Sequence, residues 1–297
     1  MMNLCAETCS RSVVVTGASG GIGHATVEAL LARGFTVWAA ARTESAARRL
    51  RDELGARLRT LVFDVTDDEA VRVAGSRVVA AGPLFGLVNI AGAALPGPLE
   101  YVPIEQFQRQ LDVNVAGQLR VTQALLPALR TGASTWGDAR IVIMGSLDAR
   151  IVGPLLGPYA ASKHALVGLS DALRAELRPA RIKVSLLEPG AVATPIWRRG
   201  TGVLGELQPT LPDHGGPYRS IMNFAQRYVS KLSTLGASPD RVADAVVRAL
   251  THPSPSPRQA VGIDAKVVTA ALHLLPPRVI YRLTALPRVG SAREHNR

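Results

Sequence analysis

Cysteine is nearly absent from this chain. Of its 297 residues only Cys5 and Cys9 are cysteines, and both stand in the first ten positions. A disulfide between residues so close in sequence would stabilise little, and a Cys-x-x-x-Cys pair without further Cys or His makes a poor metal site. We therefore expect free thiols in a reducing compartment, a flexible tail over residues 1–11, and no bound metal.

Long apolar runs are absent as well. No stretch of the sequence reaches the roughly 18–20 apolar residues that a membrane-spanning helix needs. Residues 1–11 have neither a basic start nor an apolar core, so they do not resemble a secretory signal. These absences predict a cytoplasmic protein, with peripheral contact to a membrane left open.

Acidic residues are fewer than basic ones, and aromatic residues are scarce. The net charge is +11, and residues 196–297 alone carry 14 basic and 6 acidic side chains. Aromatic residues make up 4% of the chain and form no stripe interleaved with the basic ones, so nucleic-acid binding is not expected. The excess positive charge suits an anionic surface or an anionic substrate.

Short β-rich apolar runs alternate with helical patterns. The expected strands are Ser12–Thr16, Thr36–Ala40, Thr60–Phe63, Gly86–Asn89, Arg140–Met144, Lys183–Leu187 and one near Ala260–Ile263. The expected helices are Gly21–Arg33, Thr43–Leu54, Asp67–Ala80, Ile104–Leu129, Tyr159–Arg178 and Pro239–Leu250. Continuous apolar runs such as Val13–Val15 are typical of strands buried on both faces. The alternation predicts an α/β fold, a doubly wound parallel sheet in a Rossmann-type three-layer sandwich.

We expect a single domain over residues 12–264, followed by a helical, basic extension over residues 265–297. After Pro195 the alternation stops, and residues 196–236 mix Gly and Pro with apolar side chains. That variable segment is either a substrate-binding lid or an extra helix that packs on the domain or on a second subunit. Its apolar side chains are Val203, Leu204, Leu207, Leu211, Ile221, Met222, Phe224 and Tyr228.

A glycine-rich loop, residues 16–23, connects the first expected strand to the first expected helix. Glycines at this place let the backbone turn tightly and approach a pyrophosphate, whose charge meets the helix N-terminus. In an alternating α/β chain the loop predicts dinucleotide binding. The candidate residues are Gly17, Ser19, Gly21, Ile22 and Gly23.

The end of the second expected strand distinguishes between two dinucleotides. NAD-binding domains place an acidic residue here for the ribose 2′-hydroxyl, whereas an arginine suits the 2′-phosphate of NADP. This chain has no acidic residue at that point and offers Arg42 instead. We therefore predict NADP in preference to NAD.

Three reactive side chains follow the fifth expected strand. Tyr159 and Lys163 are one helical turn apart, so they share a helix face, and Ser146 precedes them by a short loop. An ammonium close to a phenol favours the phenolate, which would lower the pKa of Tyr159 towards neutrality. Such a phenol exchanges a proton with a carbonyl or an alcohol, and a neighbouring serine hydroxyl can hold the same oxygen.

With these motifs assembled, the sequence resembles the classical short-chain dehydrogenases/reductases over about residues 12–195 and near residue 262. The matching motifs are Thr-Gly-x-x-x-Gly-x-Gly at residues 16–23, Asp64-Val65, Asn89-Ile90-Ala91-Gly92, Asn114, Ser146, Tyr159-x-x-x-Lys163, and Pro189-Gly190 followed by Val192 and Thr194. The one departure is Ile90, where the family usually has a second Asn.

The resemblance implies an NADP(H)-dependent alcohol or carbonyl oxidoreductase. It implies that Asp64 and Val65 contact the adenine, and that Asn89 steadies the sheet beside the cofactor. It further implies that Asn114 helps to hold a proton-relaying water. The other implied cofactor contacts are Ala91, Gly92, Tyr159, Lys163 on the nicotinamide ribose, Pro189, Gly190, Val192, and Thr194 near the nicotinamide amide.

The substrate and the partners are less defined. Long C-terminal extensions occur in relatives that act on retinoids and hydroxysteroids, which favours a lipophilic small-molecule substrate; such enzymes are often homo-oligomers. A non-catalytic NADP(H) sensor or scaffold and a nucleotide-sugar epimerase or dehydratase are the alternatives. A basic amphipathic helix near the C-terminus would suit an anionic membrane surface. Its stripe is Val279, Ile280, Leu283 and Leu286, with Arg278 and Arg282 beside it.

Overall fold

The computed structural model describes residues 11–55, 58–212, 218–223, 225 and 236–284. Seven parallel strands form one sheet in the order β3-β2-β1-β4-β5-β6-β7. The strands are β1 Ser12–Val15, β2 Thr36–Ala41, β3 Leu58–Val62, β4 Gly86–Asn89, β5 Ala139–Met144, β6 Ile182–Pro189 and β7 Arg258–Val261. This is the doubly wound Rossmann-type sheet that the sequence predicts.

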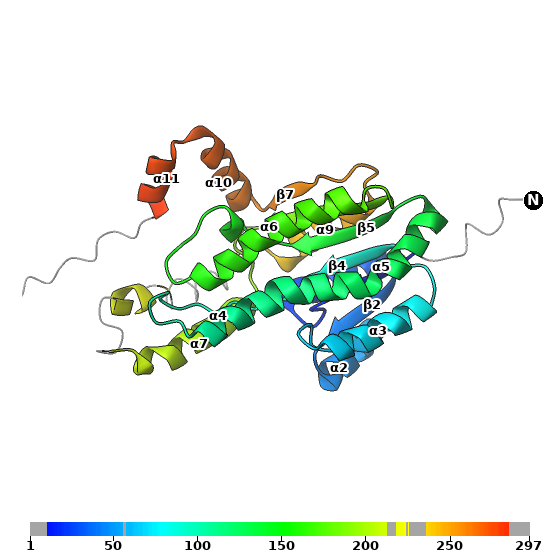
Figure 1. Ribbon diagram of the computed structural model, residues 1–297, viewed down its shortest axis with the longest axis horizontal. Helices are drawn as coiled ribbons and strands as arrows, with labels where there is room; N and C mark the ends of the chain where they lie inside the picture. Colours follow the sequence, from blue (N-terminus) through cyan, green and yellow to red (C-terminus); the bar gives the residue numbers. More distant parts are fainter. Residues whose placement is uncertain (1–10, 56–57, 213–217, 224, 226–235, 285–297) are drawn as a thin grey trace, which may run out of the picture.

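Helices cover both faces of the sheet (Figure 1). They are α1 Gly21–Ala32, α2 Glu44–Leu54, α3 Asp68–Ala80, α4 Ile104–Leu111, α5 Gly117–Trp136, α6 Gly157–Leu177, α7 Ile196–Leu207, α9 Pro239–Thr251, α10 Ile263–Leu274 and α11 Pro277–Thr284. Short helical segments are η1 Asp112–Ala116, η2 Leu147–Ala149 and η3 Gln208–Thr210. Helices α5 and α6 cross one face, and α10 and α11 extend beyond the β7 edge (Figure 1).

Two hydrophobic cores, one on each face, explain why the strands are continuously apolar. Val13 and Val15 of β1 point into a core with α1 and α9, whereas Val14 points into a core with α3, α5 and α6. Successive strand residues face opposite sides, so a strand between two helical layers needs apolar residues at every position. The burial of Val13, Val14 and Val15 is complete.

Two expected elements differ from those observed. The single helix expected over Ile104–Leu129 is interrupted by a π-helical segment, η1, and then continues to Trp136. The late strand expected near Ala260–Ile263 ends at Val261, because Gly262 has a φ of +106° and turns the chain into α10. A residue with a side chain adopts that φ only under strain.

Part of the variable segment builds a small third core. Leu204, Leu211 and Met222 are buried together with Leu155, a residue from the loop before α6. Leu207 and Ile221 pack against this cluster. Phe224 and Tyr228, two further apolar residues expected to belong to the segment, lie outside the described residues.

Candidate active site

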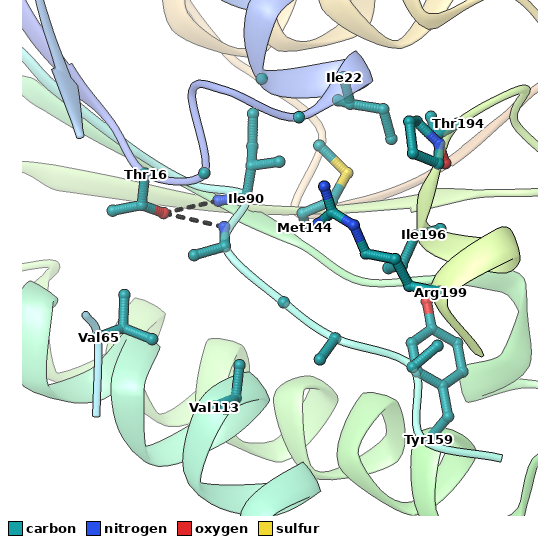
Figure 2. Close-up of a pocket in the computed structure, with 18 of the residues that line it drawn as sticks. Thr16, Ile22, Val65, Ile90, Val113, Met144, Tyr159, Thr194, Ile196 and Arg199 are labelled. Carbon is teal, nitrogen blue, oxygen red and sulfur yellow. Dashed lines mark hydrogen bonds between the residues drawn. The ribbon is translucent and has the colours of Figure 1, made fainter. Parts of the chain in front are cut away.

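One cavity of about 770 Å³ lies at the carboxyl ends of the strands, where ligands bind in open parallel sheets (Figure 2). Most of the residues singled out from the sequence line it. These are Gly17, Ser19, Gly21, Ile22, Gly23, Arg42, Asp64, Val65, Ala91, Gly92, Ser146, Tyr159, Lys163, Pro189, Gly190, Val192 and Thr194. Asn89 and Asn114 do not line the cavity and lie in its supporting walls.

The glycine-rich loop is held close to the end of β4. The Thr16 hydroxyl accepts hydrogen bonds from the backbone N–H groups of Ile90 at 3.0 Å and Ala91 at 3.1 Å (Figure 2). A Cβ at Gly17 would lie 2.9 Å from the Ala91 nitrogen, and one at Gly23 would lie 2.1 Å from the Gly17 carbonyl oxygen. The backbone therefore needs glycine at both positions to pack this tightly.

The N-terminus of α1 suits a pyrophosphate. Its N-cap, Gly20, offers no side-chain cap, and no acidic residue lies in the first turn. The N–H groups at the start of a helix lack intrahelical partners and carry the positive end of the helix dipole. Since Gly20, Gly21, Ile22 and Gly23 line the cavity, this end of it fits an anionic group.

Arg42 and Asp64 line the cavity at the ends of β2 and β3. Burial raises the pKa of the Asp64 carboxyl, but hydrogen bonds from Thr66 and the charges of Arg42 and Arg109 outweigh burial, so the pKa lies below its ordinary value. Arg42 is exposed at the end of β2 and forms no ion pair with a described residue. Its guanidinium is thus free to meet a ligand phosphate.

Helix α6 positions Tyr159 and Lys163 on one face, and the loop after β5 places Ser146 beside them. Ser146, Tyr159 and Lys163 are 6%, 6% and 4% exposed. The Lys163 ammonium donates to the Met144 carbonyl at 2.9 Å and lies 5.4 Å from the centre of the Tyr159 ring. Ser146 is hydrogen-bonded to Tyr159, so all three groups meet at the cavity wall.

The expected lowering of the Tyr159 pKa is wrong for the chain by itself. Burial raises the pKa of the phenol, the negative charge of Asp148 raises it further, and the hydrogen bond with Ser146 only partly compensates. Burial lowers the pKa of Lys163 to about 8, against the opposing effect of Asp148. Desolvation of these two buried side chains therefore outweighs the attraction between phenolate and ammonium.

Two asparagines fix the walls. Asn114, within η1, donates to the Ala93 carbonyl at 3.0 Å and to the Ser162 hydroxyl at 2.9 Å, and it accepts from the Ala93 N–H at 2.8 Å. These bonds connect the loop after β4 to α6 at Ser162, the residue that precedes Lys163. Asn89 donates to Thr122 at 3.0 Å, which anchors β4 to α5. Their buried positions and protein partners make both asparagines supports of the site.

The family model for short chain dehydrogenases matches residues 11–201. The chain belongs to this family. NADPH-dependent 3-dehydrocapnine reductase from Ornithobacterium rhinotracheale is 34% identical over 281 residues, or 92% of this chain and 95% of that protein. Retinol dehydrogenase 5 from Mus musculus is 32% identical over 280 residues, or 90% of this chain and 86% of that protein.

A solved structure of a short chain dehydrogenase has the same fold over nearly the whole chain. A short chain dehydrogenase from Burkholderia cenocepacia in complex with NADP superposes with a TM-score of 0.71 at 25% identity, covering 94% of this chain and 98% of that one. Family membership makes the chain an NAD(P)-dependent oxidoreductase. Within the described ranges, no group of three or more His, Cys, Asp or Glu side chains is arranged to hold a metal ion.

Several residues of this short-chain dehydrogenase site were not expected from the sequence. Trp197 packs edge-on against Tyr159 with ring centres 5.9 Å apart, and Arg109 and Arg199 line the cavity. Arg199 extends from α7 into the cavity (Figure 2). Asp148 hydrogen-bonds Ser146 at 2.8 Å. Of these four residues, only Asp148 could have been noticed in the sequence, because it is an acidic residue two positions after the candidate Ser146.

Proposed function

We propose that this short-chain dehydrogenase interconverts a lipophilic alcohol and its carbonyl with NADP(H), and that Tyr159 exchanges the proton at the substrate oxygen. The observation that carries the proposal is the meeting of Ser146, Tyr159 and Lys163 at the wall of a cavity whose other end is the glycine-rich loop. NADP(H), when bound, supplies or takes up the hydride. NADP in the Burkholderia cenocepacia structure and the NADPH-dependent relative support this choice of cofactor.

The protonation state of Tyr159 favours reduction. Because the pKa of the buried phenol lies above its ordinary value, the phenol is protonated at neutral pH. A protonated phenol is the form that gives a proton to a carbonyl oxygen, and the Ser146 hydroxyl is placed to hold that oxygen. The nearby Lys163 ammonium would stabilise the phenolate that remains.

Apolar side chains that line the cavity, among them Trp197 against Tyr159, support a lipophilic substrate. Leu95, Ile196, Trp197 and Val203 line the cavity, and the last three belong to α7, the first part of the proposed lid over residues 196–236. Pockets for apolar ligands combine such a lining with a few polar groups that orient the reacting atom. The resemblance to retinol dehydrogenase 5 points to the same substrate class.

A cofactor-oxidation assay tests the proposed function. We expect the purified protein to oxidise NADPH with at least one ketone or aldehyde from a panel of steroids, retinoids and long-chain carbonyl compounds. Binding of NADPH without turnover of any panel compound would favour the sensor or scaffold. Conversion of a nucleotide sugar without net oxidation of NADPH, detected by analysis of the sugar product, would instead favour an epimerase or dehydratase, so these sugars are tested alongside the panel.

Arg42 is expected to select the cofactor. Arg42→Ala removes the guanidinium proposed for the 2′-phosphate, and charge-assisted hydrogen bonds of this kind contribute about 1.5–3 kcal/mol, or about 10–100-fold in affinity. We expect the NADPH dissociation constant to rise by that factor while the NADH constant changes by less than about threefold. Fluorescence titration measures both. Arg48→Ala, an exposed arginine on α2 outside the cavity, is the control, and equal losses for NADPH and NADH would refute the assignment.

We also propose that α10 and α11 contact an anionic membrane surface. Ile263, Val267 and Leu274 of α10 are 70%, 61% and 81% exposed, and exposed Arg278 and Arg282 lie on α11. Apolar and cationic side chains together suit the boundary of anionic lipids. The side chain of Leu283 is not described, and Leu286 lies outside the described residues. No described helix is long and apolar enough to cross a membrane.

Liposome flotation tests this contact. We expect the protein to float with vesicles that contain anionic lipid, and the Val267→Glu/Leu274→Glu variant to stay in the dense fractions. Vesicles of neutral lipid serve as the control for charge. If both proteins stay unbound while the variant changes the molecular mass in solution, the exposed face is a contact between subunits and the membrane proposal is wrong.

A further inference from the structure

Asp148 forms a close pair with Ser146. The Ser146 hydroxyl oxygen caps the short helix η2 by accepting from the Asp148 N–H at 3.1 Å, and the same hydroxyl donates to the Asp148 carboxylate at 2.8 Å. Ser146 lines the cavity, whereas Asp148 does not. The Asp148 carboxyl therefore lies outside the cavity wall, and its hydrogen bond with the serine is its direct contact with the site. Its charge also acts to raise the pKa values of Tyr159 and Lys163.

The serine hydroxyl carries a single proton. The Asp148 carboxylate, which accepts its hydrogen bond at 2.8 Å, competes for that proton with the Tyr159 oxygen and with a substrate oxygen. An ionised carboxyl accepts hydrogen bonds only, so it accepts the hydrogen bond of the Ser146 hydroxyl and leaves the serine oxygen with lone pairs alone to offer a substrate. A substrate carbonyl oxygen is also an acceptor, and two acceptors cannot form a hydrogen bond. A protonated Asp148 can instead donate to the serine oxygen, which frees the serine proton for the substrate oxygen.

The surroundings of Asp148 raise the pKa of its carboxyl above the ordinary value for aspartate. Burial raises the pKa of its carboxyl, against the lowering effects of the Ser146 hydrogen bond, the Lys163 charge, its own N–H group and His164. From α6 it faces Tyr159, Lys163 and His164. The acidic group on β6, Glu188, is already paired with Arg150 at 2.6 Å and Arg258 at 2.5 Å.

We propose that Asp148 is a positioning residue that acts through Ser146: its protonated form directs the serine proton to the substrate oxygen, and its carboxylate form directs the proton away. The inference rests on the proposed function, because it concerns carbonyl reduction at the oxygen that Ser146 holds. It makes this short-chain dehydrogenase a better reductase on the acidic side of the Asp148 titration, because only there is the serine proton available.

Asp148→Asn is the first test. The amide has nearly the same shape, stays neutral at every pH and can donate to the Ser146 oxygen. Over the pH range in which both proteins stay folded, we expect the wild-type kcat/KM for carbonyl reduction to fall at least fivefold, as pH rises, through an ionisation that Asp148→Asn lacks. Unchanged NADPH affinity and unchanged melting temperature would show that the variant is folded. Superimposable pH profiles of the two proteins would overturn the proposal.

Ser146→Ala shows whether the effect passes through the serine. We expect the kcat/KM of Ser146→Ala to be low and to lack the same ionisation, and Ser146→Ala/Asp148→Asn to differ from it by less than twofold at pH 6. Interacting residues are non-additive in this way, whereas independent ones add. An Asp148→Asn effect of equal size with and without Ser146 would mean that Asp148 acts by another route.

A measurement without substrate separates this proposal from the proposed function. Carbon-13 NMR of labelled aspartate carboxyls, with Asp148→Asn to assign the signal, follows the Asp148 titration directly. We expect its midpoint above the ordinary aspartate value of about 3.9, and higher still in Ser146→Ala, which lacks the hydrogen bond that stabilises the carboxylate. An Asp148 titration midpoint that is the same in the wild type and in Ser146→Ala would overturn the Asp148 proposal. Absence of turnover by the wild type, in contrast, counts against the proposed function.

Discussion

Tyr159→Phe is expected to lower kcat by at least about 1000-fold while NADP(H) affinity stays within about threefold. The phenylalanine ring keeps the edge-on contact with Trp197 and the position over Lys163, so the cavity retains its shape. The variant loses only the hydroxyl that, in the proposed function, exchanges a proton with the substrate oxygen. Steady-state kinetics on a substrate from the panel and a fluorescence titration with NADPH measure the two quantities.

Tyr218→Phe is the matched control for this variant. Tyr218 hydrogen-bonds Glu100 at 2.8 Å and does not line the cavity, so its hydroxyl can be removed without touching the proposed chemistry. We expect its kcat to stay within about twofold of the wild type, because the hydrogen bond that it loses is exposed and lies outside the cavity, while the ring keeps its packing on the third core. A Tyr159→Phe enzyme with wild-type turnover would show that another group supplies the proton.

Gly23→Ala is expected to weaken NADP(H) binding by at least about 100-fold and to lower the melting temperature. The added Cβ would lie 2.1 Å from the Gly17 carbonyl oxygen and 2.9 Å from the Ala18 Cα, distances at which the backbone must move. That movement separates the glycine-rich loop from the start of α1, whose N–H groups are placed for the pyrophosphate. Fluorescence titration and thermal melting detect the two losses.

Gly168→Ala provides the comparison within a helix. Gly168 lies in α6, and a Cβ there meets no atom within 4 Å. Alanine in a helix interior is more stable than glycine by about 0.5–1 kcal/mol, so we expect an equal or higher melting temperature and unchanged cofactor affinity. If Gly23→Ala behaved like Gly168→Ala, the tight packing of the loop would not be needed for cofactor binding.

The local sequence pattern was enough to predict the sheet. Val13, Val14 and Val15 alternate between the two cores, and this double burial is why their run is continuously apolar. The turn at Gly262 was harder to predict from the sequence. The residues Ala260–Ile263 fit the pattern of a continuous strand, and only the positive φ at Gly262 shows that the strand ends before it. Likewise, no pattern distinguishes a π-helical segment such as η1 from the ordinary helix around it.

Within the cavity, motif spacing predicted the residues that line it far better than their electrostatics. The helical spacing of Tyr159 and Lys163 correctly placed them on one face of α6, but the expected direction of the Tyr159 pKa shift was wrong. That direction depends on burial and on Asp148, and both arise from the packing of η2 against α6. Trp197 and Arg199 came from α7, where the sequence had no motif to mark them.

The parallel sheet, the glycine-rich loop and the family follow from local sequence, because they depend on residue type and on spacing along a regular strand or helix. Packing in three dimensions alone fixes which side chains share the cavity with Tyr159, how deeply they are buried, and that the Ser146 hydroxyl donates to Asp148. Burial and electrostatic coupling depend on distances between segments that are far apart in the chain, and local periodicity carries no information about those distances.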